Sequence, residues 1–212
     1  MGRSVPQTAT RVHLVRHGET QAPRGTIAGR LDVPLALRGF EQARSLAALL
    51  SSSPLASVYA STSRRAVETA RAIAAPHGLE PNEVADLREI DFGLLEGTTF
   101  AVVAREYPEI AHAWLHRPDQ VRFPNGESFL EMHRRARRSL LAILGRHAAT
   151  AVALVCHAGP IRALVAEALG FTQQRSFEIA CAVGSVTTLD FASVCSAPLS
   201  ARLVRYEDVP PR

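Results

Sequence analysis

The stretch VHLVRHGET, residues 12–20, decides the fold. Residues 12–16 form a short, valine-rich run, which predicts a buried β-strand. Arg16 and His17 stand at the end of this strand, and Gly18 then leaves room for a ligand to approach the backbone. Ligands of open α/β sheets bind just beyond the carboxyl ends of the strands. An arginine and a histidine at this place therefore predict a site for an anion.

Two other segments repeat this layout. The apolar run AVALVC, residues 151–156, is followed by His157, Ala158 and Gly159. Residues 57–60 read as another strand, and the loop STSRRA, residues 61–66, follows it with two arginines. We expect these loops to bring two imidazoles and two guanidinium groups together around one tetrahedral anion.

The rest of the chain alternates helices with strands, which predicts an α/β fold. Apolar residues recur at helical spacing in four segments, residues 38–50, 64–75, 128–147 and 160–169. Residues 186–191 and 202–206 read as further strands. Such alternation predicts a three-layer α/β/α sandwich around a mostly parallel sheet. Residues 1–10 are expected to be a flexible N-terminus, and residues 11–212 a single domain.

One insertion interrupts the alternation. Residues 98–118 look helical and are broken by Pro108, and the stretch from about 88 to 135 contains no clear strand. We expect it to form a small helical cap over the sheet. Trp114, Tyr107, His112 and Arg117 are candidates to line the mouth between cap and sheet, although core packing or exposure explains each of them equally well.

Composition excludes several classes of protein. Apolar residues make up 47% of the chain and charged residues 21%, as in an ordinary soluble domain. The net charge is +4, all of the basic residues are arginine, and no basic stripe alternates with aromatic residues, so nucleic-acid binding is not expected. No apolar run approaches the roughly 18 residues that cross a membrane. Three scattered cysteines without a CxxC pair and a polar N-terminus predict a cytoplasmic protein.

Six ordered blocks give the chain a family resemblance. They are LVRHGET (14–20), GRLDVPL with a later glycine and QA pair (29–43), STSRRAVETA (61–70), LREIDFGLLEG (87–97), PNGES (124–128) and VCHAGPIRAL (155–164). Together they resemble the signature of the histidine phosphatase superfamily, in the branch that includes cofactor-dependent phosphoglycerate mutases. The resemblance implies a phosphoglycerate mutase-like fold.

The resemblance also implies a role for each matching residue. His17 would be the nucleophile that becomes phosphohistidine, and Arg16 and Arg65 would hold the phosphoryl oxygens. His157 would complete the pocket, and Glu89 would act as general acid and base. These roles suit the chemistry, because arginine forks match phosphate oxygens and a leaving alkoxide needs a proton.

Gly29 and Ala158 are further candidates to bind the phosphate. Arg64 remains a rival to Arg65, and Asp91 remains a rival to Glu89. Pro23 stands where the family often has a phosphate-binding asparagine, so one contact must be missing or come from elsewhere.

No metal and no cofactor are expected, because arginines and histidines can neutralise the phosphate. His112 and His116 have i, i+4 spacing that could suit a metal ion, but an exposed cap surface is the favoured interpretation. Four arginines of one segment are expected to form a solvated helix face, with the alternative that one of them reaches the substrate: Arg134, Arg135, Arg137 and Arg138.

The family includes both phosphatases and mutases, so the resemblance alone does not say which reaction to expect. Mutases of this branch typically carry a lysine eleven residues after the acid, where this chain has Phe100. We therefore expect a phosphomonoester hydrolase that acts on a small phosphorylated metabolite, similar in RHGETQA and GRLDVPL to alpha-ribazole phosphatases. The alternatives are a phosphoglycerate mutase and a catalytically silent module that binds phosphorylated ligands. Dimers are common in this branch, so a homodimer is possible.

Overall fold

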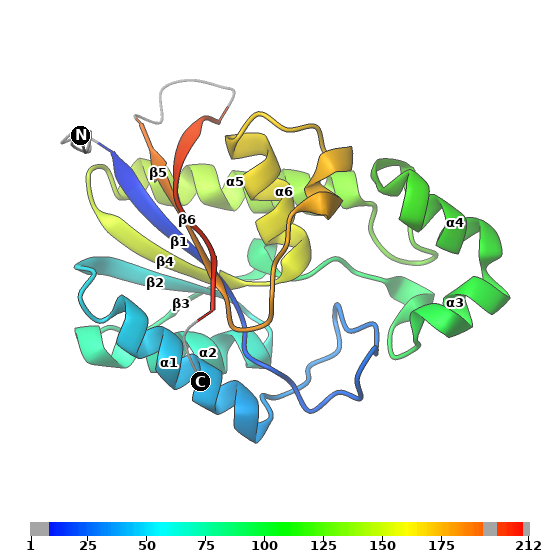
Figure 1. Ribbon diagram of the computed structural model, residues 1–212, viewed down its shortest axis with the longest axis horizontal. Coiled ribbons are helices and arrows are strands. Elements are labelled where there is room, and N and C mark those ends of the chain that lie inside the picture. The colour runs from blue at the N-terminus through cyan, green and yellow to red at the C-terminus, as the bar shows by residue number, and fades with distance from the viewer. Residues whose placement is uncertain (1–8, 193–198, 210–212) are drawn as a thin grey trace.

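A six-stranded sheet runs through the computed structural model, which describes residues 9–192 and 199–209 (Figure 1). Its strands, in spatial order, are β3 (Asn82–Val84), β2 (Leu55–Ser61), β4 (Ala151–Cys156), β1 (Thr10–Arg16), β5 (Val186–Phe191) and β6 (Ala201–Asp208). The first four are parallel, whereas β5 runs antiparallel to β1 and β6 antiparallel to β5. The predicted mostly parallel sheet is confirmed. Only the short, largely exposed β3 was missed, because it lacks an apolar run.

Two pairs of helices cover the two faces of the sheet (Figure 1). They are α1 (Leu37–Leu50) with α2 (Arg64–Ala74), and α5 (Phe129–Arg146) with α6 (Ala158–Ala168). Successive residues of β1 point to opposite faces of the sheet. Leu14 packs in the apolar core between the sheet and α5 and α6, and Val15 packs in the core between the sheet and α1 and α2. β4 is buried along its whole length, as expected for a strand covered on both faces. The three-layer α/β/α sandwich is confirmed.

Two short helices lie beyond the end of the sheet, apart from both layers (Figure 1). They are α3 (Phe100–Glu106) and α4 (Pro108–His116), and Pro108 separates them as predicted. Single 3₁₀ turns link the remaining segments: η1 (Ala75–His77), η2 (Ala85–Leu87), η3 (Gly93–Leu95), η4 (Pro118–Gln120) and η5 (Gln174–Glu178). A third apolar cluster, which includes Val103, Phe123 and Met132, joins α3 and α4 to the start of α5.

The bounds of these elements bear on the expected domain organisation. Residues 129–135, expected in the cap, form the beginning of α5, which continues across the sheet. β1 begins at Thr10, and residues 1–8 of the predicted flexible N-terminus lie outside the described part of the chain. Among the described residues, none of the helices combines the length and the apolar character that crossing a membrane requires.

Candidate active site

Three parallel strands end side by side and carry the predicted residues. The register pairs Arg16 at the end of β1 with Cys156 at the end of β4, so His17 and His157 leave neighbouring strands at the same level. The two imidazole centroids lie 5.1 Å apart. Ser61 ends β2, and its hydroxyl lies 2.8 Å from Nε2 of His157. The expected convergence of the three loops is therefore observed. We call Arg16, His17, Arg65 and His157 the histidine pocket.

His17 is held as a neutral imidazole whose Nε2 carries no hydrogen. Its Nδ1 lies 2.8 Å from the carbonyl oxygen of Gly18, and because a carbonyl only accepts, Nδ1 carries the hydrogen. Burial, followed by the charge of Arg65, lowers the pKa of His17 from 6.5 to about 3. Nε2 therefore keeps a lone pair and accepts a bond from Nε of Arg65 at 3.3 Å. A neutral imidazole with its other nitrogen tethered is a competent nucleophile.

Arg65 is almost completely buried, with 1% of its surface exposed. Its Nη1 donates to the carbonyl of Leu31 at 2.7 Å, and its Nη2 donates to those of Gly29 and Ala28 at 2.9 and 3.1 Å. These carbonyl groups orient the guanidinium of Arg65 against His17. Gly29 thus takes part by supporting Arg65, and a Cβ at this glycine would meet the backbone oxygen of Ile90 at 1.9 Å.

Arg64, the rival of Arg65, points elsewhere. It is exposed, and its Nε donates to Glu68 on the next turn of α2 at 2.8 Å. The two neighbours differ because Arg65 lies on the buried face of α2, together with Ala66 and Thr69, whereas Arg64 faces solvent. Of the two, the structure brings Arg65 to His17.

His157 and Arg16 each present a buried nitrogen with no partner within the described residues. These atoms are Nδ1 of His157 and Nε of Arg16. Burial and then the charge of Arg65 lower the pKa of His157 well below its usual value. Nη1 of Arg16 donates to the carbonyl of Cys181 at 2.5 Å. Because buried polar groups in proteins are nearly always paired, two such nitrogens in one pocket suit a ligand with several oxygen atoms.

Glu89 follows η2 in the chain, and its carboxylate lies at the N-terminus of α6, next to the histidine pocket. One carboxylate oxygen accepts from the amide of Ile90 at 2.9 Å and the other from the amide of Gly159 at 3.2 Å. A Cβ at residue 159 would come within 2.3 Å of the carboxylate of Glu89, so a larger residue there would displace this carboxylate. Asp91, the rival acid, forms an ion pair with Arg30 at 3.4 Å instead.

Arg135 corrects the expectation of a solvated arginine face. It is 7% exposed, and its guanidinium donates to the carbonyl groups of Asp86, Arg88 and Glu89 at 2.6–2.8 Å. Glu127 pairs with the same guanidinium through two bonds of 2.8 Å. Helical spacing carried the missing signal, since residue 135 lies on the apolar face of α5 together with residues 132, 136 and 139. Arg135 therefore fixes the backbone from which Glu89 projects.

The other three arginines of this segment differ from Arg135. Arg134 and Arg138 are exposed, as expected for a solvated helix face, and Arg138 pairs with Asp86 at 3.2 Å. Arg137 is half-buried and pairs with Glu167 of α6 at 2.6 Å. None of the three lines the cavity beside Glu89.

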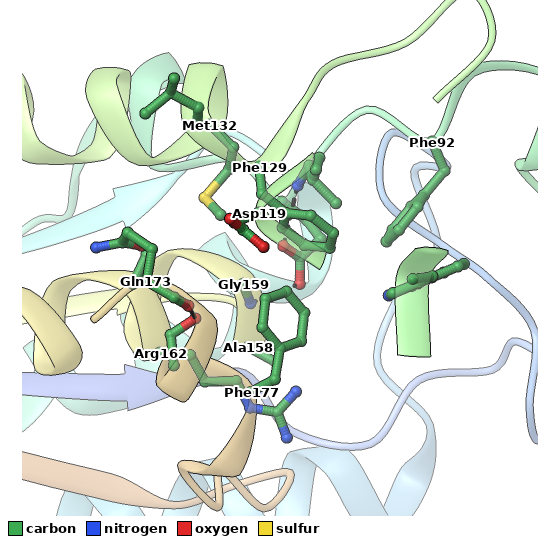
Figure 2. A pocket seen from close by; sticks show the side chains of 15 residues that line it. Phe92, Asp119, Phe129, Met132, Ala158, Gly159, Arg162, Gln173 and Phe177 are labelled. Atoms are coloured by element: carbon green, nitrogen blue, oxygen red, sulfur yellow. Dashed lines mark hydrogen bonds between the residues drawn. The ribbon is translucent and has the colours of Figure 1, made fainter. Parts of the chain in front are cut away.

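A cavity of about 430 Å³ opens beside Glu89, between α4, α5, α6 and η5 (Figure 2). We call it the aromatic cavity. Four aromatic side chains line it, namely Phe92, Trp114, Phe129 and Phe177. The remaining lining residues are Glu89, Ile90, Asp119, Leu130, Met132, Ala158, Gly159, Arg162, Ala163, Gln173 and Ser176. Ala158 thus lies on the wall between this cavity and His157.

The candidates for the mouth of the site divide in two. Trp114 and Tyr107 both pack on the third apolar cluster, but of the two Trp114 alone also lines the aromatic cavity. His112 and Arg117 are exposed and lie outside the lining. His112 and His116 lie side by side with their centroids 4.6 Å apart, and both are exposed on α4. In residues 9–192 and 199–209, no three histidine, cysteine or acidic side chains gather as a metal site would require.

Comparisons with known proteins agree with this geometry. The chain is 34% identical to "Phosphoserine phosphatase 1" of Hydrogenobacter thermophilus, over 79% of this chain and 80% of that protein. It is 29% identical to the "Adenosylcobalamin/alpha-ribazole phosphatase" of Escherichia coli, over 85% and 89%. The structure of Bacillus stearothermophilus YhfR matches with a TM-score of 0.85 and 27% identity, over 95% of this chain and 98% of that one. The sequence model of one protein family, the histidine phosphatase superfamily (branch 1), matches residues 12–198, and the chain belongs to this family.

Proposed function

We propose that the protein hydrolyses the phosphomonoester of a small metabolite through a phosphohistidine at His17, with Glu89 as general acid and base. One observation carries the proposal. The tether from Nδ1 of His17 to Gly18 leaves Nε2 with a lone pair, and a buried arginine points at that lone pair. An incoming phosphoryl group would find a nucleophile and a fixed positive charge at the same place.

The reaction balances in two steps. In the first, Nε2 of His17 attacks phosphorus, the ester P–O bond breaks, and the protonated carboxyl of Glu89 gives its proton to the leaving oxygen. In the second, the Glu89 carboxylate takes a proton from water, the water oxygen attacks phosphorus, and the P–N bond breaks. Inorganic phosphate leaves, and Glu89 is again protonated for the next turnover.

Three side chains support this division of labour. The guanidinium groups of Arg16 and Arg65 carry the positive charge that phosphoryl oxygens require, without any change of protonation. Nδ1 of His157 is buried and unpaired in the described structure, and a phosphoryl oxygen would give it a partner. The charges of these side chains support a reaction that proceeds without a metal ion.

One observation favours phosphatase activity over mutase activity. Phe100 begins α3, at the position where mutases typically carry a lysine, and its ring packs against Trp114 with centroids 5.8 Å apart. An aromatic ring cannot hold a second phosphate or carboxylate. Water therefore has the better access to the phosphorylated enzyme.

Trapping the intermediate tests the proposal. Wild-type protein, the His17→Ala variant and an exposed-histidine control, His112→Ala, are given p-nitrophenyl phosphate in excess chelator. Alkaline quenching preserves phosphohistidine, which mass spectrometry then locates. We expect phosphate on His17 in the wild type and the control, and a rate at least about 10³-fold lower in His17→Ala.

The other outcomes point to other functions. Activity that disappears with the chelator would indicate a metal-dependent enzyme. Binding of phosphate without turnover in any variant would favour a silent binding module. Interconversion of 2- and 3-phosphoglycerate, stimulated by the bisphosphate, would indicate a mutase.

A further inference from the structure

The aromatic cavity is built differently from the histidine pocket, and the difference indicates what occupies it. Phe92 and Trp114 stack with their ring centroids 5.3 Å apart, and Phe129 meets Phe177 edge to face at 4.6 Å. Figure 2 shows Phe129 and Phe177 close together and Phe92 apart from them. All four rings are only half-buried. They therefore present apolar surface to the cavity that a ligand can cover.

A buried ring holds these side chains in place. Phe123 is 1% exposed, and its ring lies 4.9 Å from both Phe92 and Trp114 and 5.7 Å from Phe129. Three of the four lining rings thus rest on one fixed core residue. A preformed wall loses little conformational freedom when it binds a ligand.

The polar groups of the lining are few, and the protein itself occupies several of them. The hydroxyl of Ser176 donates to the carbonyl of Gln173 at 2.6 Å, and Nε of Arg162 donates to that of Ile179 at 2.8 Å. The charged side chains are two carboxylates, Glu89 and Asp119, against the single guanidinium of Arg162. The cavity therefore offers no surplus of positive charge to a second anionic group.

We propose that the aromatic cavity binds the alcohol part of the substrate and selects an alcohol that carries an aromatic ring over a small hydroxy acid such as serine or glycerate. This inference rests on the proposed phosphatase function, because Glu89 belongs both to the cavity and to the proposed reaction. The volume of about 430 Å³ falls among cavities that hold drug-sized ligands. Around serine, the unfilled apolar space would hold water with few hydrogen-bond partners.

A pair of substrates that differ by the ring alone tests the selection. Ethyl phosphate and 2-phenylethyl phosphate both release simple primary alcohols, so their demands on the chemistry match. Burial of the ring is expected to raise kcat/KM by about 10- to 100-fold for 2-phenylethyl phosphate. Phosphoserine and 3-phosphoglycerate should not exceed ethyl phosphate. Equal values for the matched pair, or a preference for either hydroxy acid over 2-phenylethyl phosphate, would overturn the inference.

Matched variants locate the effect. Phe177→Ala should lower the ratio between the two substrates at least about threefold, because it removes one wall of the cavity. Phe171→Ala, the same substitution at an exposed position outside the lining, should leave the ratio unchanged. The inference fails if both variants shift the ratio equally or if neither does.

A binding measurement separates this inference from the proposed function. Calorimetry compares propylphosphonate with 3-phenylpropylphosphonate, which need no turnover. Tighter binding of the phenyl compound, weakened by Phe177→Ala, supports the selection even if no ester is hydrolysed. Equal affinities overturn it, even in an active phosphatase.

Discussion

The histidine pocket and the aromatic cavity share Glu89 but differ in construction. His17, Arg65 and His157 are 8, 1 and 0% exposed. The two histidines directly follow the ends of β1 and β4, and Arg65 lies in the first turn of α2. The aromatic cavity draws half-exposed rings from four separate segments of the chain. The difference teaches that the proposed nucleophile and His157 are positioned by the strand ends, whereas the proposed selectivity depends on how α4 and η5 meet α5 and α6.

Acid is expected to destabilise the fold through three buried histidines, two of which belong to the histidine pocket. The pKa values of His13, His17 and His157 fall, mainly through burial, to about 4, to about 3 and well below the usual value. In the unfolded chain these imidazoles bind a proton near pH 6.5. Below that pH the unfolded state takes up protons that the native state refuses. The free energy of unfolding should therefore fall between pH 7 and pH 5, by about 2 kcal/mol for each of His13 and His17 and further through His157.

Guanidinium denaturation at a series of pH values measures this loss. His17→Gln removes one of the three buried imidazoles and should reduce the loss between pH 7 and pH 5 by about 2 kcal/mol. His112→Gln, on the exposed surface of α4, should leave the pH dependence unaltered. Equal stability at pH 7 and pH 5 would show that the buried imidazoles are not held neutral.

The next largest effect is expected from Arg65, and Arg64 is its natural control. Lysine has a single charged head and cannot contact His17 while also donating to Leu31, Gly29 and Ala28. Arg65→Lys should lower kcat/KM for p-nitrophenyl phosphate by about 10²- to 10³-fold. Arg64→Lys keeps an exposed charge near Glu68 and should stay within about twofold of the wild type. Wild-type kinetics in Arg65→Lys would remove Arg65 from the proposed mechanism.

The histidine pocket could be predicted from the sequence far better than the aromatic cavity. The strand ends and their histidines could be predicted, because motif and strand lie within a few residues of each other. The aromatic cavity could not be predicted. Trp114 and Tyr107 are both aromatic residues of the expected cap, and only the packing of α4 decides that Trp114 lines the cavity. Arg135 was misjudged because charge predicts exposure in most helices. Its partners are Glu127, just before α5, and the backbone carbonyls of Asp86, Arg88 and Glu89, which lie far away in the sequence.

The smallest expected effect concerns Arg135, which holds the backbone at Glu89, the residue shared by the histidine pocket and the aromatic cavity. Its guanidinium holds the backbone at Asp86, Arg88 and Glu89, so it is a positioning residue for the proposed acid. Arg135→Met leaves these carbonyls and Glu127 without their partner and should lower the thermal stability of the protein. It should also reduce kcat for ethyl phosphate by about 10- to 100-fold, a fraction of what a general acid contributes.

A comparison of leaving groups separates positioning from simple damage. p-Nitrophenolate leaves without much help from a proton, whereas ethoxide needs one, so misplacement of Glu89 should slow ethyl phosphate about tenfold more than p-nitrophenyl phosphate. Arg134→Met, at the exposed neighbouring position, should slow neither substrate. Arg135→Lys should recover part of the lost kcat for ethyl phosphate, because its ammonium can still reach Glu127 or one of the carbonyls. If Arg135→Met slows both esters by the same factor, Arg135 only stabilises the fold, and the link between α5 and the proposed acid has to be abandoned.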